Sequence, residues 1–392
     1  MTALLAALTA IGPLTTDMYL PSLPDIARLM EIPAAQVQLT ISSYLVGFAV
    51  GQLFYGPLSD RYGRRPMLIA ANLLFCLATA LCATAPSNGF LIVARAFQAI
   101  GGCGGIVLAR AIVRDLYSGA RAGRELSLIA SVMAIAPVIA PLIGGVLQAA
   151  FGWRSSFIVL TAFGVALTAS VWWLLPETRE RAAREPMSFG STLRVFRTFL
   201  GDGAFLAHMG LVVLSFGGLF AWISGTSFVL QNLYGLAPVE FGVAFAIGSV
   251  GYMSGAAIAA RVVGRLGLDR TMGLGVCAMA AGGLLMAAGV AFAVPSALAL
   301  VVPMAIYLAG MGLVLGQAMA GAMSPYKRNS GAASSLLGFM QQSGAAICGA
   351  VVELLLGDSA WPLAGAVALL GCLSLALWAA TRGVRARAVD PH

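Results

Sequence analysis

Twelve apolar runs, each about 20 residues long or longer, follow one another along this sequence. A helix of about 20 residues crosses the roughly 30 Å hydrocarbon core of a bilayer and satisfies its backbone hydrogen bonds internally. A membrane β-barrel would show short segments of alternating polarity instead. We therefore predict an all-α membrane protein with spans at 2–24, 37–59, 67–86, 90–112, 126–150, 154–175, 204–230, 238–260, 271–293, 296–321, 331–356 and 360–381.

The composition also indicates a lipid environment. Apolar residues make up 60% of the 392 residues and charged residues only 10%, whereas soluble domains are about half apolar and about a quarter charged. The net charge of +8 comes from short basic segments between apolar runs, so we expect no nucleic-acid binding. All six cysteines lie inside apolar runs without metal-ligand spacing, and we predict neither disulfides nor a metal site.

The longest polar stretch divides the twelve spans into two sets of six. We predict an N-terminal six-helix bundle at 1–175, a cytoplasmic linker at 176–203, a C-terminal six-helix bundle at 204–382 and a cytoplasmic tail at 383–392. This organisation corresponds to two pseudo-repeated bundles within one chain.

A weak internal repeat supports the two halves. Arg61-Tyr62-Gly63 and Arg265-Leu266-Gly267 each stand between the second and third spans of their half. Repeats of this kind are typical of transporters whose binding site lies between the halves.

The basic residues predict the orientation of the chain. Twenty of the 23 Lys and Arg residues lie on one side of the predicted topology, and cytoplasmic loops carry the excess of these residues. Both termini are therefore expected in the cytoplasm, with the protein in a bacterial-type inner membrane. The first run lacks a basic leading segment and contains Asp17, so we expect a membrane helix and not a signal peptide.

The loop after the second run combines glycines, an aspartate and several arginines between residues 56 and 66. Glycines allow a tight turn, and the aspartate can pair with a nearby arginine. This pattern resembles the signature loop of the major facilitator superfamily, which is cytoplasmic as the charge pattern predicts here. The alternative is a basic loop that only sets topology. The resemblance implies a conformational latch made of Gly56, Asp60, Arg61, Gly63, Arg64 and Arg65.

Arg95 lies inside the fourth run, followed one turn later by Gln98 on the same helix face. An arginine within a membrane helix is costly and suggests a function. The alternative is an arginine that extends to the outer interface. The segment resembles the arginine motif in the fourth helix of proton-coupled members of the superfamily.

Asp17 is the only acidic residue well inside a predicted span. It lies about 22 Å from the inner end of its helix, and Arg95 is at about 21 Å on the same scale. A pair between these side chains is therefore geometrically possible. Burial favours the neutral acid and a nearby arginine favours its anion, so proton binding can be reversible. The alternative for Asp17 is a structural hydrogen bond near Pro21.

The fifth run contains two prolines and a glycine pair, at Pro137, Pro141, Gly144 and Gly145. Prolines kink a helix and small residues permit close helix contacts. The segment resembles the antiporter motif of major facilitator exporters, except that Ala136 and Ala140 stand where the fuller motif has glycines. A generic kinked membrane helix is the alternative.

Together, five segments resemble the Bcr/CflA branch of drug:proton antiporters within the superfamily. They are 17–21, 56–66, the Arg95 motif, 113–115 and 176–178. The resemblance implies proton-coupled efflux of small amphiphilic drugs or metabolites by alternating access. It also implies that Asp115 joins Asp60 and Arg64 in one charge network.

Substrate contacts are predicted less sharply, because drug pockets are mostly apolar with few polar anchors. Packing is the alternative for each candidate. We expect Glu353 at the outer interface and assign no role to His208. The candidates are Tyr44, Trp222, Tyr252, Gln341 and Gln342.

No pattern typical of an enzyme or of a nucleotide-driven pump is present. The only lysine, Lys327, lies outside any Gly-rich phosphate loop. We predict a monomer without cofactors that uses the proton gradient as its energy source. Proton-coupled uptake and an uncoupled facilitator or receptor on the same fold stay open as alternatives.

Overall fold

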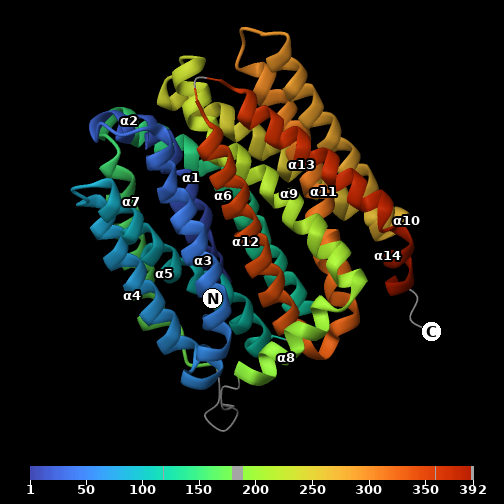
Figure 1. Ribbon diagram of the computed structural model, residues 1–392. Coiled ribbons are helices and arrows are strands. Elements are labelled where there is room, and N and C mark those ends of the chain that lie inside the picture. The colour runs from blue at the N-terminus through green and yellow to red at the C-terminus, as the bar shows by residue number, and fades with distance from the viewer. Residues whose placement is uncertain (118, 179–188, 358, 390–392) are drawn as a thin grey trace. The chain divides into compact units, whose positions relative to one another are not determined.

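The computed structural model describes residues 1–117, 119–178, 189–357 and 359–389. Within these ranges the secondary structure is helical and no strand occurs (Figure 1). Eleven of the described helices are long and apolar enough to cross a membrane. The predicted all-α membrane fold is therefore confirmed.

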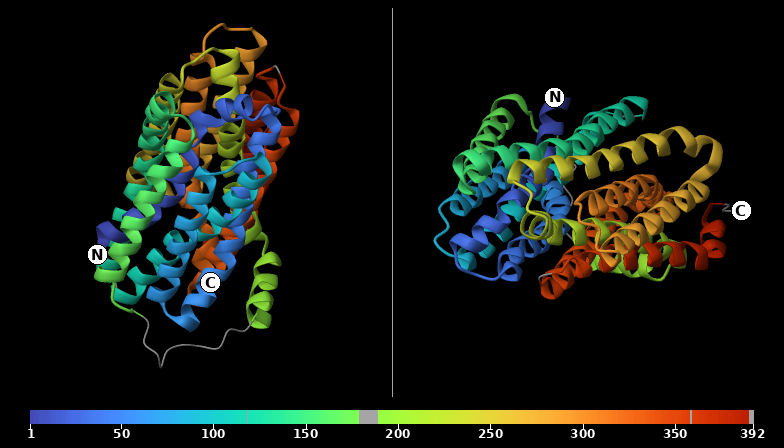
Figure 2. Two further views of the ribbon diagram at one scale, coloured as in Figure 1. Left: turned by 90° about the vertical axis from the view of Figure 1, so that its left-hand side faces the viewer. Right: turned by 90° about the horizontal axis from the view of Figure 1, so that it is seen from above.

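One of these eleven helices accounts for two spans. Helix α10 (Pro238–Ala291) has 54 residues, about 80 Å at 1.5 Å per residue and more than twice the hydrocarbon thickness. Gly267 interrupts it with φ 77° and ψ 171°, a backbone conformation that is essentially restricted to glycine. The helix turns back there (Figure 2). The predicted eighth and ninth spans thus meet at Gly267, and the prediction of twelve spans agrees with the structure.

The first compact unit comprises residues 1–188 and 238–242. Helix α5 packs against α3 and α4, α7 packs against α4, and α1 packs against α6 (Figure 1). A continuous apolar core joins them, with Tyr44, Phe48 and Phe75 among its large members. The helices are α1 (Thr2–Asp17), α2 (Leu23–Leu29), α3 (Ala34–Tyr62), α4 (Arg64–Ala83), α5 (Asn88–Leu116), α6 (Gly119–Phe151) and α7 (Arg154–Leu174), with a 3-10 turn at Leu20–Ser22.

The second compact unit comprises residues 189–237 and 243–392. Its central element is α9, which packs against α11, α12 and α13 and continues into a π-helical turn, η3. The elements are α8 (Phe189–Leu200), α9 (Gly203–Phe228), η3 (Val229–Leu233), most of α10, α11 (Leu298–Met323), η4 (Ser324–Asn329), α12 (Ser330–Leu355), α13 (Trp361–Ala380) and α14 (Arg382–Val389).

Two helices lie where the sequence suggested only polar connections. Helix α8 occupies the second part of the predicted linker. Its Phe199 ring stacks on Phe205 at 5.2 Å and meets Tyr326 edge-on at 4.6 Å, so α8 is anchored to the second unit. Residues 179–188 of the linker lie outside the described residues. Helix α14 begins at Arg382, the last residue of the predicted C-terminal bundle, and continues into the predicted tail, where Arg385 is buried.

Candidate functional site

A glycine turn positions the central arginine of the loop between α3 and α4. Gly63 has φ 102° and ψ 154°, which side chains with a Cβ avoid. Helix α4 therefore starts directly at Arg64, whose side chain is buried with only 6% of the residue exposed. The turn thus places the Arg64 guanidinium inside the first unit, at the end where α3 and α4 meet.

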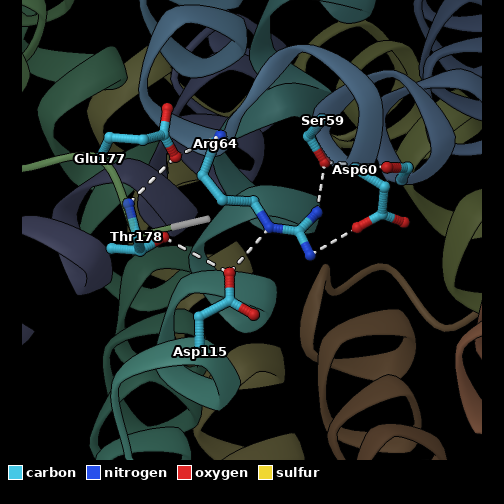
Figure 3. Close-up of polar contacts among 7 residues, drawn as sticks. Ser59, Asp60, Arg64, Asp115, Glu177 and Thr178 are labelled. Atoms are coloured by element: carbon cyan, nitrogen blue, oxygen red, sulfur yellow. Dashed lines mark hydrogen bonds and ion pairs between the residues drawn. The ribbon is translucent and has the colours of Figure 1, made fainter. Parts of the chain in front are cut away.

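Arg64 joins three helices and the segment after α7 (Figure 3). Its Nη2 lies 2.7 Å from Asp60 Oδ1 and its Nε donates to Asp115 Oδ2 at 2.9 Å. Nη1 donates to Ser59 Oγ at 2.5 Å, and the backbone N–H donates to Glu177 Oε1 at 2.9 Å. We call these residues, together with Thr178, the Arg64 cluster.

Thr178 closes the cluster from the segment after α7. Its Oγ1 donates to Asp115 Oδ2 at 3.4 Å, and its backbone N–H donates to Glu177 Oε1 at 3.0 Å (Figure 3). A buried guanidinium needs such a set of acceptors to offset its loss of hydration. The structure thus brings together Asp60, Arg64 and Asp115, whereas the parts played by Glu177 and Thr178 were not predicted.

Besides the turn residue Gly63, three of the predicted latch residues lie outside this cluster. Arg61 is exposed and its guanidinium lies 5.3 Å from the ring of Tyr62. Arg65 donates to the Trp172 carbonyl oxygen at 2.5 Å. A Cβ added to Gly56 would meet no atom within 4 Å, so close helix contact does not explain this glycine.

Arg95 is fully buried in the first unit and does not extend to an interface. Its Nη1 donates to Gln98 Oε1 at 2.7 Å and to the Thr15 carbonyl oxygen at 3.2 Å. The guanidinium also lies 4.4 Å from the ring centroid of Tyr44 and 4.7 Å from that of Tyr19. Aromatic faces stabilise a desolvated cation, so Arg95 is held between two rings and an amide.

Two donors of this arginine remain unsatisfied. Within the described residues, Nε and Nη2 of Arg95 have no hydrogen-bond partner, and neither does the buried hydroxyl of Tyr44. Gln98 is fixed from its other end, since its Nε2 donates to Thr79 Oγ1 at 2.9 Å. The arrangement leaves buried hydrogen-bond donors next to α1 for an acceptor group.

Asp17 is the last residue of α1 and is 5% exposed. Its side chain therefore does not face lipid. In the part of the chain that the structure describes, its carboxylate forms no ion pair with Arg95 or with another cation. The guanidinium reaches the Thr15 carbonyl oxygen of the same helix instead. Depth in the membrane brings the two residues to the same level, but the predicted pair is not formed in this structure.

The two prolines and two glycines of the predicted antiporter motif all lie inside α6. Pro137 is half-buried, and Pro141, Gly144 and Gly145 are buried. A Cβ added to Gly144 would lie 2.3 Å from the carbonyl oxygen of Met18, far inside contact distance. Glycine is thus required where α6 meets the residue that follows Asp17.

Four of the predicted substrate contacts are buried and the fifth, Tyr252, is half-buried. Tyr44 lies beside Arg95 in the first unit. Trp222 is 1% exposed on α9, Gln341 and Gln342 are each 8% exposed on α12, and Tyr252 is half-buried on α10. Their assignment to a substrate site stays a prediction.

The structure adds two groups that the sequence did not reveal. Glu353, which was expected near the outer interface, is 1% exposed, and Ser224 Oγ donates to its Oε1 at 3.1 Å. Arg385 Nε donates to Asp269 Oδ1 at 2.9 Å. The helix-end position of Glu353 and the tail position of Arg385 gave no signal of burial. His208 is also buried, with Nδ1 2.8 Å from the Ala204 carbonyl oxygen.

Several known proteins resemble this chain along most of its length. The family model described as Major Facilitator Superfamily matches residues 5–349. An uncharacterized MFS-type transporter, YdgK of Bacillus subtilis (strain 168), is 36% identical over 92% of this chain and 87% of its own. Multidrug resistance protein D of Escherichia coli (strain K12) is 30% identical over 96% and 94%, respectively. The bicyclomycin resistance protein homolog of Haemophilus influenzae is 29% identical over 92% and 90%.

Solved structures show the same fold at low sequence identity. The xylose transporter XylE from E. coli, in a partially occluded inward-open conformation, has a TM-score of 0.76 and 14% identity, covering 98% of this chain and 96% of that chain. A bacterial homolog of the human lysosomal transporter Spinster has a TM-score of 0.70 and 17% identity with the same coverage.

Proposed function

This chain belongs to the major facilitator superfamily of membrane transporters, and we propose that it exports small amphiphilic drugs or metabolites in exchange for protons. The observation that carries the proposal is Asp17, a carboxyl group buried in a membrane span without an ion-pair partner among the described residues. Such a group is costly to keep unless it binds and releases a proton.

The names of the relatives support export over uptake. Relatives along most of the chain are named for multidrug resistance, bicyclomycin resistance and chloramphenicol resistance. Export also agrees with the Pro137 to Gly145 segment, which resembles the antiporter motif.

Asp17 and Arg95 each lack an interaction partner that the other could provide. Asp17 lacks a cation, while Arg95 Nε and Nη2 lack acceptors within the described residues. In our proposal the pair forms only in the state of the cycle in which Asp17 has lost its proton. Substrate binding favours proton release, and reprotonation separates the pair again. While the pair is separated, the Arg95 guanidinium is held by Tyr44, Tyr19 and Gln98.

The Arg64 cluster acts in this proposal as the conformational latch. It joins the ends of α3, α4 and α5 to the segment after α7. Breaking it requires a buried charge to lose several partners together, and such a contact has two discrete states. In this role it controls when the transporter changes between its inward-open and outward-open conformations.

The remaining elements of the proposal follow from the sequence. The protein works as a monomer in the bacterial inner membrane with both termini in the cytoplasm, and the proton gradient replaces a cofactor. Trp222, Tyr252, Gln341 and Gln342 are the proposed substrate contacts of the second unit, with Tyr44 in the first.

The test is proton release driven by substrate in inverted membrane vesicles, with chloramphenicol as the first compound of a panel. We expect addition of substrate to release protons from vesicles that contain the protein. Asp17→Asn should abolish this release and the protection of the host, because the amide cannot bind a proton at this position. The measurements are vesicle pH and the inhibitory concentration of the compound.

Asp25→Asn is the matched control, since Asp25 lies eight residues further on and pairs at the surface with Arg28. It should leave proton release intact. Proton-driven transport by Asp17→Asn at the normal rate would contradict the role of Asp17. Protons that enter the cytoplasm together with substrate would show a symporter, and transport without proton movement would show an uncoupled facilitator.

A further inference from the structure

Glu353 is a second buried carboxyl group, and it lies in the second unit. It is 1% exposed on α12, within the membrane span Ala332–Leu355. The proton-exchange proposal above makes no use of it. A carboxylate within a membrane span costs free energy, so its presence suggests a function.

The structure contains a cradle that suits this carboxyl group. Ser224 of α9 is fully buried, and its Oγ donates to Glu353 Oε1 at 3.1 Å. Gly349, one turn earlier on α12, makes room for this contact, because a Cβ there would lie 2.6 Å from Ser224 Oγ. A hydroxyl can donate to a carboxylate and can accept from a carboxylic acid. The same contact therefore suits both protonation states.

The surroundings of Glu353 favour a side chain that is neutral while buried. Its neighbour Val352 belongs to an apolar cluster with Ala221 and Leu370. The sequence places no Lys or Arg in 203–260, 271–326 or 329–381, so the cations of this half lie toward the opposite ends of its helices. Apolar packing of this kind disfavours the charged form of a carboxyl group.

Other titratable groups occur on α12 and on the elements packed against it. Ser224 and His208 are 16 residues apart on α9, about 24 Å. The side chains of Lys327 and Arg328, and Asp358, lie outside the described residues. The described groups are Arg197 on α8, His208 on α9, Tyr307 on α11, Tyr326 on η4, Cys348 on α12 and Cys372 on α13.

A line of polar residues leads from the cradle to the end of α9. Ser224, Ser227 and Gln231 follow one another at spacings of three and four, which places them on one helix face. Gln231 Nε2 donates to Ser227 Oγ at 2.9 Å, and Gln231 is only half-buried. The last of these residues lies in the π-helical turn Val229–Leu233, and such turns often occur at functional sites.

We propose that Glu353 is a second proton-binding residue of the transport cycle, loaded through the face of Ser224, Ser227 and Gln231. This inference rests on the proposed function and adds a proton site in the second half to the one at Asp17. A proton binds the Glu353 carboxylate when this face is open to water, and Ser224 then accepts the hydrogen of the acid. When the transporter is open to the other side of the membrane, the O–H bond of the acid breaks and the proton leaves to water on that side.

The first test needs no substrate. Purified wild-type protein, Glu353→Gln and Asp17→Asn are placed in liposomes, and the infrared C=O band of protonated carboxyl groups is followed over pH. We expect each variant to lose a different titrating component of the wild-type band. Ser224→Ala should shift the pH at which the Glu353 component titrates, whereas Ser374→Ala, a buried serine bonded within its own helix, should not.

The second test counts protons. In proteoliposomes with chloramphenicol as the probe, Glu353→Gln should lower the number of protons exchanged per substrate by about half, because one of two sites is lost. Glutamine keeps the hydrogen bond to Ser224, so a purely structural Glu353 predicts an unchanged ratio. If Glu353→Gln does not fold, Glu353→Asp takes its place in the infrared test, where the component should move but still titrate.

The outcomes separate the two proposals. A Glu353 component that stays constant over pH, or an unchanged proton ratio in Glu353→Gln, overturns the inference. A titrating Glu353 component in a protein that does not exchange protons for chloramphenicol supports the inference while the proposed drug export fails for that compound.

Discussion

The two halves of the chain share a backbone break but connect it to charge in different ways. Gly63 in the first half and Gly267 in the second both have positive φ and extended ψ at the same place in the repeat. In the first half the next residue, Arg64, contacts four residues in three other segments. In the second half Asp269 receives a buried arginine from the chain terminus, Arg385 of α14. The repeat therefore preserves the turn and not the charges around it.

The exposure of the acidic partner indicates how strongly each ion pair contributes to stability and transport. The Asp115 side chain is 16% exposed beside Arg64, whereas the Asp269 side chain is 38% exposed beside Arg385. An acid left without its arginine can be hydrated in the second case much better than in the first. We therefore expect the first contact to control stability and transport more strongly than the second.

The largest effect is expected for Arg64→Ala. It removes the common partner of Ser59, Asp60 and Asp115 and leaves the Asp115 carboxylate, whose side chain is 16% exposed, without its cation, which we estimate to cost about 3 kcal/mol. Thermal unfolding in detergent and drug efflux from cells measure the two consequences. Arg61→Ala, in an exposed side chain of the same loop, is the control and should change little. Equal effects of both substitutions would refute the special position of Arg64.

A smaller effect is expected from Gly63→Ala and Gly267→Ala. Each forces a Cβ into a backbone region that only glycine adopts readily, at a cost of about 2 kcal/mol. If the halves share the turn, the two variants should lose similar stability in thermal unfolding. Gly264→Ala is the control, because Gly264 is helical and a Cβ there meets open space. A large loss in one variant only would mean that the turn is needed in one half.

The smallest effect is expected for Arg385→Ala. It removes the bond to Asp269 and the contact with Trp378, whose ring centroid is 5.7 Å from the guanidinium. Since the Asp269 side chain remains hydrated, we expect a loss of about 1 kcal/mol and residual efflux. The exposed Arg382 of the same helix provides the matched substitution. Loss of stability as large as that of Arg64→Ala would contradict the ranking of the two contacts.

Much of the fold could be predicted because the bilayer imposes a length on each apolar run. The helix count, the division near residues 176–203 and the double span in α10 follow from this constraint. The Arg64 contacts were predictable in part, because Asp60 and Arg64 are only four residues apart in the sequence and Asp115 lies at the end of α5. Helix α8 was missed because its amphipathic pattern is short and lies within a polar stretch.

The site was less predictable, because sequence gives the depth of a residue in a membrane but not its rotation about the helix axis. Asp17 and Arg95 match in depth, yet the arginine bonds to Thr15 and lies between aromatic rings. Glu353 shows the same limit, since its place near a helix end gave its depth but not its burial or its bond to Ser224 of α9. Partners such as Glu177 and Arg385 come from segments whose course depends on tertiary packing.

The contact at Gly144 bears on how fast a proton can reach Asp17. The backbone of α6 touches the carbonyl oxygen of Met18 with no layer of side chains between them. The end of α1 therefore cannot loosen by rotamer changes, which take picoseconds to nanoseconds, and must move together with α6. Hydration of the Asp17 carboxyl group then requires a motion of packed helices, which takes microseconds to milliseconds. The rate of this motion sets an upper limit on the turnover rate of the transporter.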